Sequence, residues 1–292
     1  MRLKALCAGR FVPAGPFRAT VLGAFDCALS LVLPDGRLVG LLSPVLPRTP
    51  WGIRLASVPH LFREILPPGA PARSEGTVLY FPEHGLNIEL GGVTSWLDDT
   101  ILPPDRMPDL ARAVHDVTEL LRRQNMYGLS LLYTEGLGLP SMALNTALRR
   151  TAATAATNLE AAAREGDAVV ALAAARPLLG LGPGLTPSGD DFLVGFLAGL
   201  RSLPGRTIKR EHFLCEFGNE LGKLAATATN EVARTFVTHA GQGHFTESIV
   251  SLGRALAHGS GLTFAAQALL SFGASSGADT LVGIIAGWHA WN

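Results

Sequence analysis

The stretch "SGDDFLVGFLAG", residues 188–199, determines how the second half of this chain can fold. It aligns without a gap to "SGADTLVGIIAG", residues 276–287, which lies 88 positions further along the chain. The Ala, Gly and Leu bias of the sequence favours some of these matches, but the shared S-G-x-D pattern is not explained by composition. The simplest interpretation is a pair of equivalent helix starts that face each other across a pseudo-symmetric core.

Each copy carries the residue types of a helix cap and of a close helix contact. Ser188 and Ser276 are predicted N-caps, and Asp191 and Asp279, three residues later, can bond back as in a capping box. An acid in the first turn also suits the helix dipole. This structural role accounts for these residues without any chemistry, and ligand binding is the alternative. Two glycines per copy at GxxxG spacing predict close backbone packing: Gly195 and Gly199, then Gly283 and Gly287.

The first copy carries additional residues for which the capping role does not account. It is preceded by "GLGPGLTP", residues 180–187, which has no sequence match before the second copy, and Asp190 aligns with Ala278. The GxxxxG spacing from Gly184 to Gly189 is that of a P-loop, but two aspartates follow where a nucleotide-binding loop needs Lys and Ser or Thr. A dinucleotide-binding loop is also excluded, because an alanine-rich helical stretch precedes the glycines instead of a strand.

A Gly-rich turn at a helix N-terminus can instead present backbone N–H groups to a small anion. Asp190 could then orient an amide of the substrate, act as a general base, or hold Mg²⁺. Arg234 is either an anion clamp or a charge on a helix surface. The candidate catalytic residues are Asp190 and Asp191, and the candidate ligand-binding residues are Gly182, Gly184, Thr186, Ser188, Gly189, Arg234, Ser276, Gly277 and Asp279.

The two halves of the chain differ in hydrophobic period, which predicts an α+β protein with two domains. Residues 1–105 read as short strands that form a small barrel or sandwich, with a hairpin turn at Pro34–Gly36. Residues 106–292 read as a helical domain. The expected strands include residues 76–81, 85–90 and 92–97, and the expected helices include residues 110–121, 188–203, 209–236, 246–258 and 262–270, with a last helix from residue 276.

The composition restricts the classes of function and of partner. Among 292 residues, 24 basic and 24 acidic side chains give a formal net charge of zero, and no Lys/Arg block offers a surface for nucleic acid or for an anionic membrane. No uncharged apolar run reaches the roughly 18 residues that span a bilayer. The three cysteines form no CxxC pair, which argues against a zinc ribbon and is typical of a reducing cytoplasm. We therefore expect a cytoplasmic protein.

The block "LLGLGPGLTPSGDDFLVGFLAGL", residues 178–200, together with "FGASSGADTLVGIIAG", residues 272–287, resembles the bacterial family of the AllH subunit of oxamate carbamoyltransferase. The resemblance implies conversion of oxalurate and phosphate to oxamate and carbamoyl phosphate, with other protein subunits required. It implies no established catalytic assignment for the matching residues, and no certain cofactor.

Two hypotheses follow for the function. The first is a carbamoyltransferase subunit, as a hetero- or homo-oligomer, that binds a small anionic substrate at the Gly-rich loop. The alternative is a non-catalytic subunit that binds a small carboxylate or serves assembly.

Overall fold

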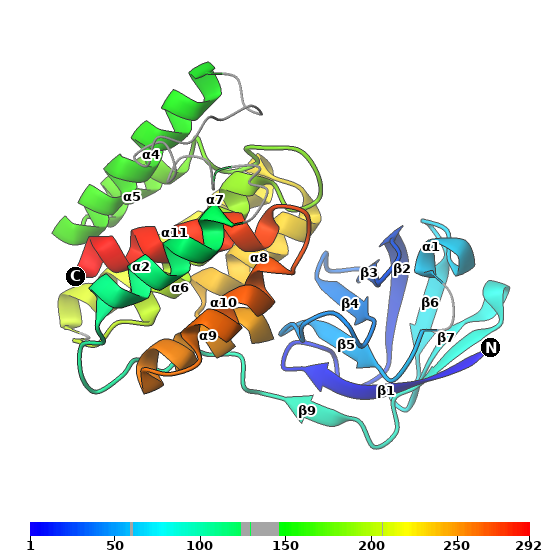
Figure 1. The fold of residues 1–292 in the computed structure, drawn as a ribbon. Helices are drawn as coiled ribbons and strands as arrows, with labels where there is room; N and C mark the ends of the chain where they lie inside the picture. The colour runs from blue at the N-terminus through cyan, green and yellow to red at the C-terminus, as the bar shows by residue number, and fades with distance from the viewer. Residues whose placement is uncertain (59–60, 124–128, 130–145, 206) are drawn as a thin grey trace. The chain divides into compact units, whose positions relative to one another are not determined.

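A computed structural model describes residues 1–58, 61–123, 129, 146–205 and 207–292. These residues form two compact units, Met1–Asp99 and Thr100–Asn292 (Figure 1). The first unit is built of strands and the second of helices, which confirms the predicted α+β class. The domain boundary that we placed after residue 105 stays a prediction.

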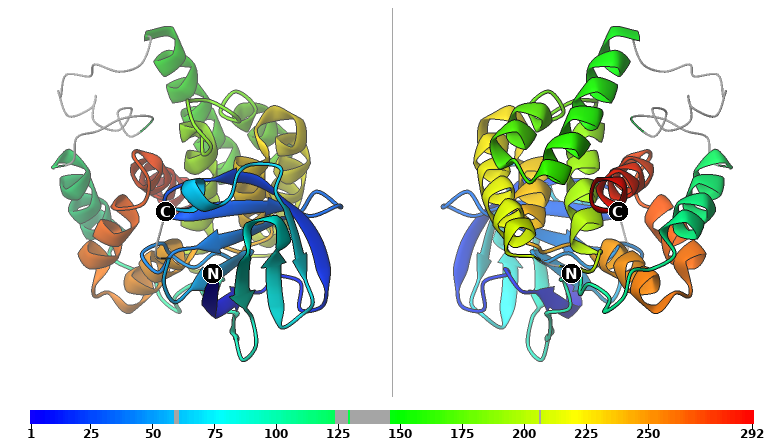
Figure 2. Two further views of the ribbon diagram at one scale, coloured as in Figure 1. Left: turned by 90° about the vertical axis from the view of Figure 1, so that its right-hand side faces the viewer. Right: turned by 90° about the vertical axis from the view of Figure 1, so that its left-hand side faces the viewer.

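The strands of the first unit form a closed barrel (Figures 1 and 2). Its eight strands follow one another in the order β5-β4-β3-β2-β6-β7-β8-β1, and pairing of β1 with β5 closes the ring. A further strand, β9, extends parallel to β1. The strands are β1 Arg2–Gly9, β2 Phe17–Ala24, β3 Ala28–Val32, β4 Leu38–Leu42, β5 Gly52–Leu55, β6 Pro71–Ser74, β7 Val78–Phe81, β8 Leu86–Glu89 and β9 Thr94–Trp96, with the short helices α1 Phe62–Ile65 and η1 Pro82–His84.

Alternation of side chains along the strands fills the barrel. In β1 every second residue is buried, beginning with Leu3, so one side of the strand faces the core and the other faces outward. The predicted hairpin is the β3–β4 connection, in which Gly36 adopts a φ of 80°. The best-buried core residues come from neighbouring strands and from α1, and include Leu29, Leu31, Leu41, Ile53, Leu55, Phe62, Leu79, Phe81 and Ile88.

The second unit is helical, as predicted, with one difference in its middle. The sequence suggested a single helix over residues 209–236, but α7 ends at Ala228 and α8 begins at Glu231. Asn230 separates them, because its side-chain oxygen accepts from the N–H groups of Val232 and Ala233 and so starts a new helix. The helices are α2 Leu110–Arg122, α4 Thr146–Glu165, α5 Ala168–Ala175, α6 Ser188–Arg201, α7 Ile208–Ala228, α8 Glu231–Gly241, α9 Glu247–His258, α10 Leu262–Leu270 and α11 Ser276–Trp291.

The helices that begin the two sequence copies, α6 and α11, lie side by side at the centre of the helical unit (Figure 1). A Cβ added to Gly195 would lie 1.9 Å from the carbonyl oxygen of Thr280. A Cβ added to Gly283 would lie 2.0 Å from the carbonyl oxygen of Phe192, which is the equivalent contact with the copies exchanged. The two backbones therefore touch about a pseudo-two-fold axis, and the predicted role of the GxxxG glycines is confirmed.

The same symmetry relates whole helix triplets, α4–α5–α6 and α9–α10–α11. Helix α6 contacts α9 as α11 contacts α4, and α5 packs on α7 as α10 packs on α2. Gly166 and Gly259 end α4 and α9 in the left-handed conformation, with φ of 69° and 65°. The internal repeat is thus a three-helix unit, larger than the pair of helix starts that the sequence revealed.

No helix in the described ranges combines the length and the apolar character needed to cross a membrane.

Candidate functional site

The two helix starts are not capped by their serines, which corrects the prediction for Ser188 and Ser276. The N-cap residues are Pro187 and Ser275, and neither start has a side-chain cap hydrogen bond. The backbone satisfies the first α6 N–H groups instead, because those of Asp190 and Asp191 both donate to the carbonyl of Pro187. The serine hydroxyls are therefore available for other contacts.

The structural match between the copies extends further toward the N-terminus than the sequence match does. In each copy a residue before the loop donates its N–H to a carbonyl three residues earlier, and its own carbonyl accepts from the glycine in the first turn of the helix. The Gly-rich stretch, which has no sequence match in the second copy, thus has a structural counterpart there. The matching pairs are Leu178 with Leu269, Leu181 with Phe272, Gly182 with Gly273 and Gly189 with Gly277.

The first loop is three residues longer than the second. Eight positions separate Leu181 from Gly189, whereas five separate Phe272 from Gly277. The additional length bulges outward, since residues 183–185 are exposed. Gly182 and Gly184 permit this path, because their φ values of 117° and 94° lie in a region that other residues rarely adopt.

The longer loop brings Thr186 against the start of the other copy. Its Oγ1 lies 2.8 Å from Oγ of Ser276, so the two hydroxyls share a hydrogen bond. Both hydroxyls also lie close enough to the carboxyl group of Asp191 to lower its pKa by favouring the charged form. These three side chains form a polar chain that runs from a half-buried threonine to a buried acid.

Asp191 faces its pseudo-symmetric counterpart, Asp279, and both are buried, with 5% and 0% of their surfaces exposed. Burial raises the pKa of Asp191 well above its usual range, and the negative charges of Asp279 and Asp190 raise it further, although the two hydroxyls oppose this. Oδ2 of Asp191 has no hydrogen-bond partner among the described residues. Asp191 therefore holds its proton to a higher pH than an exposed aspartate does.

Asp190 anchors the Gly-rich loop to the α7–α8 junction. Its Oδ2 accepts from the Thr229 hydroxyl at 2.8 Å and from the N–H of Gly180 at 3.1 Å. Burial raises its pKa and these two hydrogen bonds lower it in part, so that the pKa is about 6. Because a packing role accounts for this carboxyl group, direct contact of Asp190 with a substrate stays a prediction.

The availability of backbone N–H groups differs along the loop. Gly189 and Gly277 donate internally, to the carbonyls of Leu181 and Phe272, so their N–H groups are not free for a ligand. The place of Gly189 and Gly277 among the ligand-binding residues stays a prediction, and any contact with a ligand would have to use other atoms than these N–H groups. Other N–H groups near the start of α6 find no acceptor among the described residues, and they belong to Gly182, Gly184, Leu185, Thr186 and Ser188.

The contacts in this site give less support to a role for Arg234 or for a metal ion than to the residues described above. Arg234 lies half-buried in α8, the helix that follows Thr229, and takes no part in the hydrogen bonds described above. Within the described ranges, no three side chains of His, Cys, Asp or Glu converge as a metal site would need. We assign no chemical step to Mg²⁺.

Two residues of the site were missed by the sequence analysis, Gly180 and Thr229. Both became functional candidates only when the fold placed them against Asp190. The Asn at position 230 carried a usable signal, since Asn is a preferred N-cap and its presence inside a helical stretch indicates a break. Nothing local in the sequence indicates that this break lies beside the Gly-rich loop.

Comparison with known families supports the importance of this region. Residues 178–288 match the AllH family, described as oxamate carbamoyltransferase subunit AllH. The resemblance recognised in the sequence is thereby confirmed over this segment. The AllH match begins just before the Gly-rich loop and ends within α11, so it contains both helix starts and Thr229. No solved structure matches the chain.

Proposed function

We propose that this chain is a subunit of a carbamoyltransferase-type enzyme that acts on a small anionic amide and binds the anion at the 182–188 loop. The observation that carries the proposal is the set of N–H groups at the start of α6 that have no acceptor among the described residues, next to the Thr186–Ser276–Asp191 chain. Free N–H groups at a helix N-terminus attract carboxylate and phosphate. The description of the AllH family supports both the reaction class and the need for other subunits.

The proposed reaction is the phosphorolysis of oxalurate. A phosphate oxygen attacks the carbamoyl carbon, the bond from that carbon to the amide nitrogen breaks, and the nitrogen takes up a proton to give oxamate and carbamoyl phosphate. The loop N–H groups would hold the carboxylate or the phosphate. Asp191, whose pKa is raised by burial, would supply this proton to the leaving nitrogen through the hydroxyls of Ser276 and Thr186.

The proposal is tested by measuring carbamoyl phosphate formed from oxalurate and phosphate, with the purified chain alone and with the proteins that copurify with it. We expect Asp191→Asn, which keeps the shape but not the exchangeable proton, to lower turnover by about a hundredfold. The matched control is Asp105→Asn, at an exposed position outside the site, which should retain full turnover.

A thermal-unfolding titration with oxalurate, oxamate and phosphate separates the two functional hypotheses. Stabilisation by an anion without turnover in any complex would favour the non-catalytic binding subunit. Absence of both stabilisation and turnover would contradict the anion site itself.

A further inference from the structure

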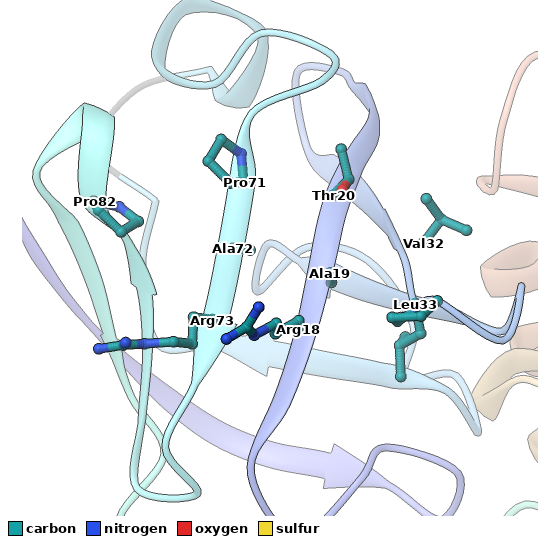
Figure 3. Close-up of a pocket in the computed structure, with 10 residues that line it drawn as sticks. Arg18, Ala19, Thr20, Val32, Leu33, Pro71, Ala72, Arg73 and Pro82 are labelled. Atoms are coloured by element: carbon teal, nitrogen blue, oxygen red, sulfur yellow. The ribbon is translucent and has the colours of Figure 1, made fainter.

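A hollow of about 490 Å³ lies on the outer face of the barrel, over strands β2, β3 and β6 (Figure 3). Its volume is within the range of small-molecule sites, roughly 300–1,000 Å³. Most of its lining is apolar and stiffened by proline, with Val32, Leu33, Pro34, Pro71 and Pro82, and its charged residues are Arg18 and Arg73. The AllH match, residues 178–288, does not cover this part of the chain.

The two arginines are direct neighbours across the β2–β6 pair. The antiparallel register sets Arg18 opposite Arg73, and strand alternation turns both outward while Ala19 and Ala72 face the core. Like charges at directly opposed positions destabilise a sheet. The barrel therefore keeps a pair of cations where packing alone would favour one cation or none.

The two side chains are held differently. Arg73 pairs with Glu75 at 2.7 Å, and its guanidinium lies 6.0 Å from the centre of the Tyr80 ring. Arg18 is exposed, extends from β2 toward β6 (Figure 3), and has no acidic side chain within salt-bridge distance among the described residues. The hollow thus combines a fixed cation, an uncompensated cation and an apolar floor.

We propose that this hollow binds a small ligand that joins a phosphate or carboxylate group to an apolar body. The anionic group would lie on the guanidinium of Arg18, since guanidinium groups bind both anions through paired N–H donors and that of Arg73 is already paired with Glu75. The apolar body would cover Val32, Leu33 and the prolines.

Calorimetric titration of the full chain tests the proposal with four probes: phenyl phosphate, phenylacetate, inorganic phosphate and phenol. We expect saturable binding of phenyl phosphate or phenylacetate with a Kd near or below about 1 mM. Which of these two binds more tightly identifies the anionic group. Inorganic phosphate lacks the apolar body and phenol lacks the fixed charge, so for both probes the part of the binding that Arg18→Gln removes should be weaker, whatever phosphate binds at the 182–188 loop.

Arg18→Gln should weaken the binding of the preferred probe by about tenfold or more, because it removes a charge-assisted hydrogen bond. The matched control is Arg2→Gln, at an exposed arginine of β1 outside the hollow, which should leave the affinity unchanged. No saturable binding of either aromatic anion, or equal affinity in wild type and Arg18→Gln, would overturn the proposal. Neither result bears on the anion site of the helical unit, which these variants leave intact.

Discussion

The two helix starts, at Ser188 and at Ser276, form the most informative comparison in this molecule. Their helices share a length of backbone contact and an equivalent hydrogen-bonded turn, so packing explains what they have in common. They differ in three loop residues, in Thr186 and in Asp190, which has Ala278 as its counterpart. The part that differs is the loop at which we propose that the anion binds.

The largest loss of stability should follow from disrupting the backbone contact between α6 and α11. Gly195→Ala sets a Cβ 1.9 Å from the Thr280 carbonyl oxygen, and Gly283→Ala sets one 2.0 Å from that of Phe192. Because backbone cannot yield as a flexible side chain does, each should lower the free energy of unfolding by about 3 kcal/mol, measured by urea unfolding.

The control for these variants is Gly222→Ala in α7, where the new Cβ would lie an ordinary 3.6 Å from Thr238. That change should be neutral or stabilising by up to about 1 kcal/mol, since alanine favours a helix. Equal losses in all three variants would mean that glycine matters here for a reason other than the α6–α11 contact.

Asp190 should make the stability of the folded chain depend on pH. Its folded pKa of about 6 lies above the ordinary aspartate pKa of 3.8, so the folded state binds the proton more tightly than the unfolded state. Its stabilising contribution is complete below pH 3.8 and is lost as the pH rises through about 6. The loss amounts to about 3 kcal/mol, and Asp191 shifts stability in the same direction.

Asp190→Asn cannot ionise, so its advantage over wild type should grow between about pH 4 and pH 7 in urea unfolding. Asp105→Asn, an exposed control, should follow the wild-type pH profile. Parallel profiles for wild type and Asp190→Asn would show that burial does not control this carboxyl group.

Deletion of residues 183–185 would give the first loop the length of the second. These residues are exposed and the equivalent turn closes without them, so the unfolding free energy should change by less than about 1 kcal/mol. The anion response should disappear, which removes about 2.7 kcal/mol of stabilisation at a hundredfold excess of oxalurate over its Kd. A deletion variant that unfolds in the absence of oxalurate, or that keeps the full response, would contradict the division of roles between the copies.

Much of the fold could be predicted from the sequence, because its signals are local. The period-two strands, the Pro34–Gly36 turn and the GxxxG spacing each predict the structure of the residues that carry the pattern. The barrel closure through β1 and β5 and the three-helix repeat depend on contacts between distant segments that carry no motif. In the site, the Gly-rich loop was predictable. The contact of Thr229 with Asp190 was not, because it joins segments that are distant in the sequence. The absence of serine caps was not predictable either, because the carbonyl of Pro187 accepts the N–H groups that a serine side chain was expected to accept.

The smallest loss of stability should follow from removing the hydrogen bond between the hydroxyls of Thr186 and Ser276, which joins the two copies. Thr186→Ala gives the first loop an alanine, as Ala274 is in the second, and Ser276→Ala removes the partner oxygen. Each should cost about 1 kcal/mol of unfolding free energy, and the double variant should cost less than the sum, with a coupling of about 1 kcal/mol. Additive losses would mean that the 2.8 Å contact contributes nothing of its own. Coupling with unchanged oxalurate phosphorolysis would restrict the pair to a structural role, so turnover is measured on the same four proteins.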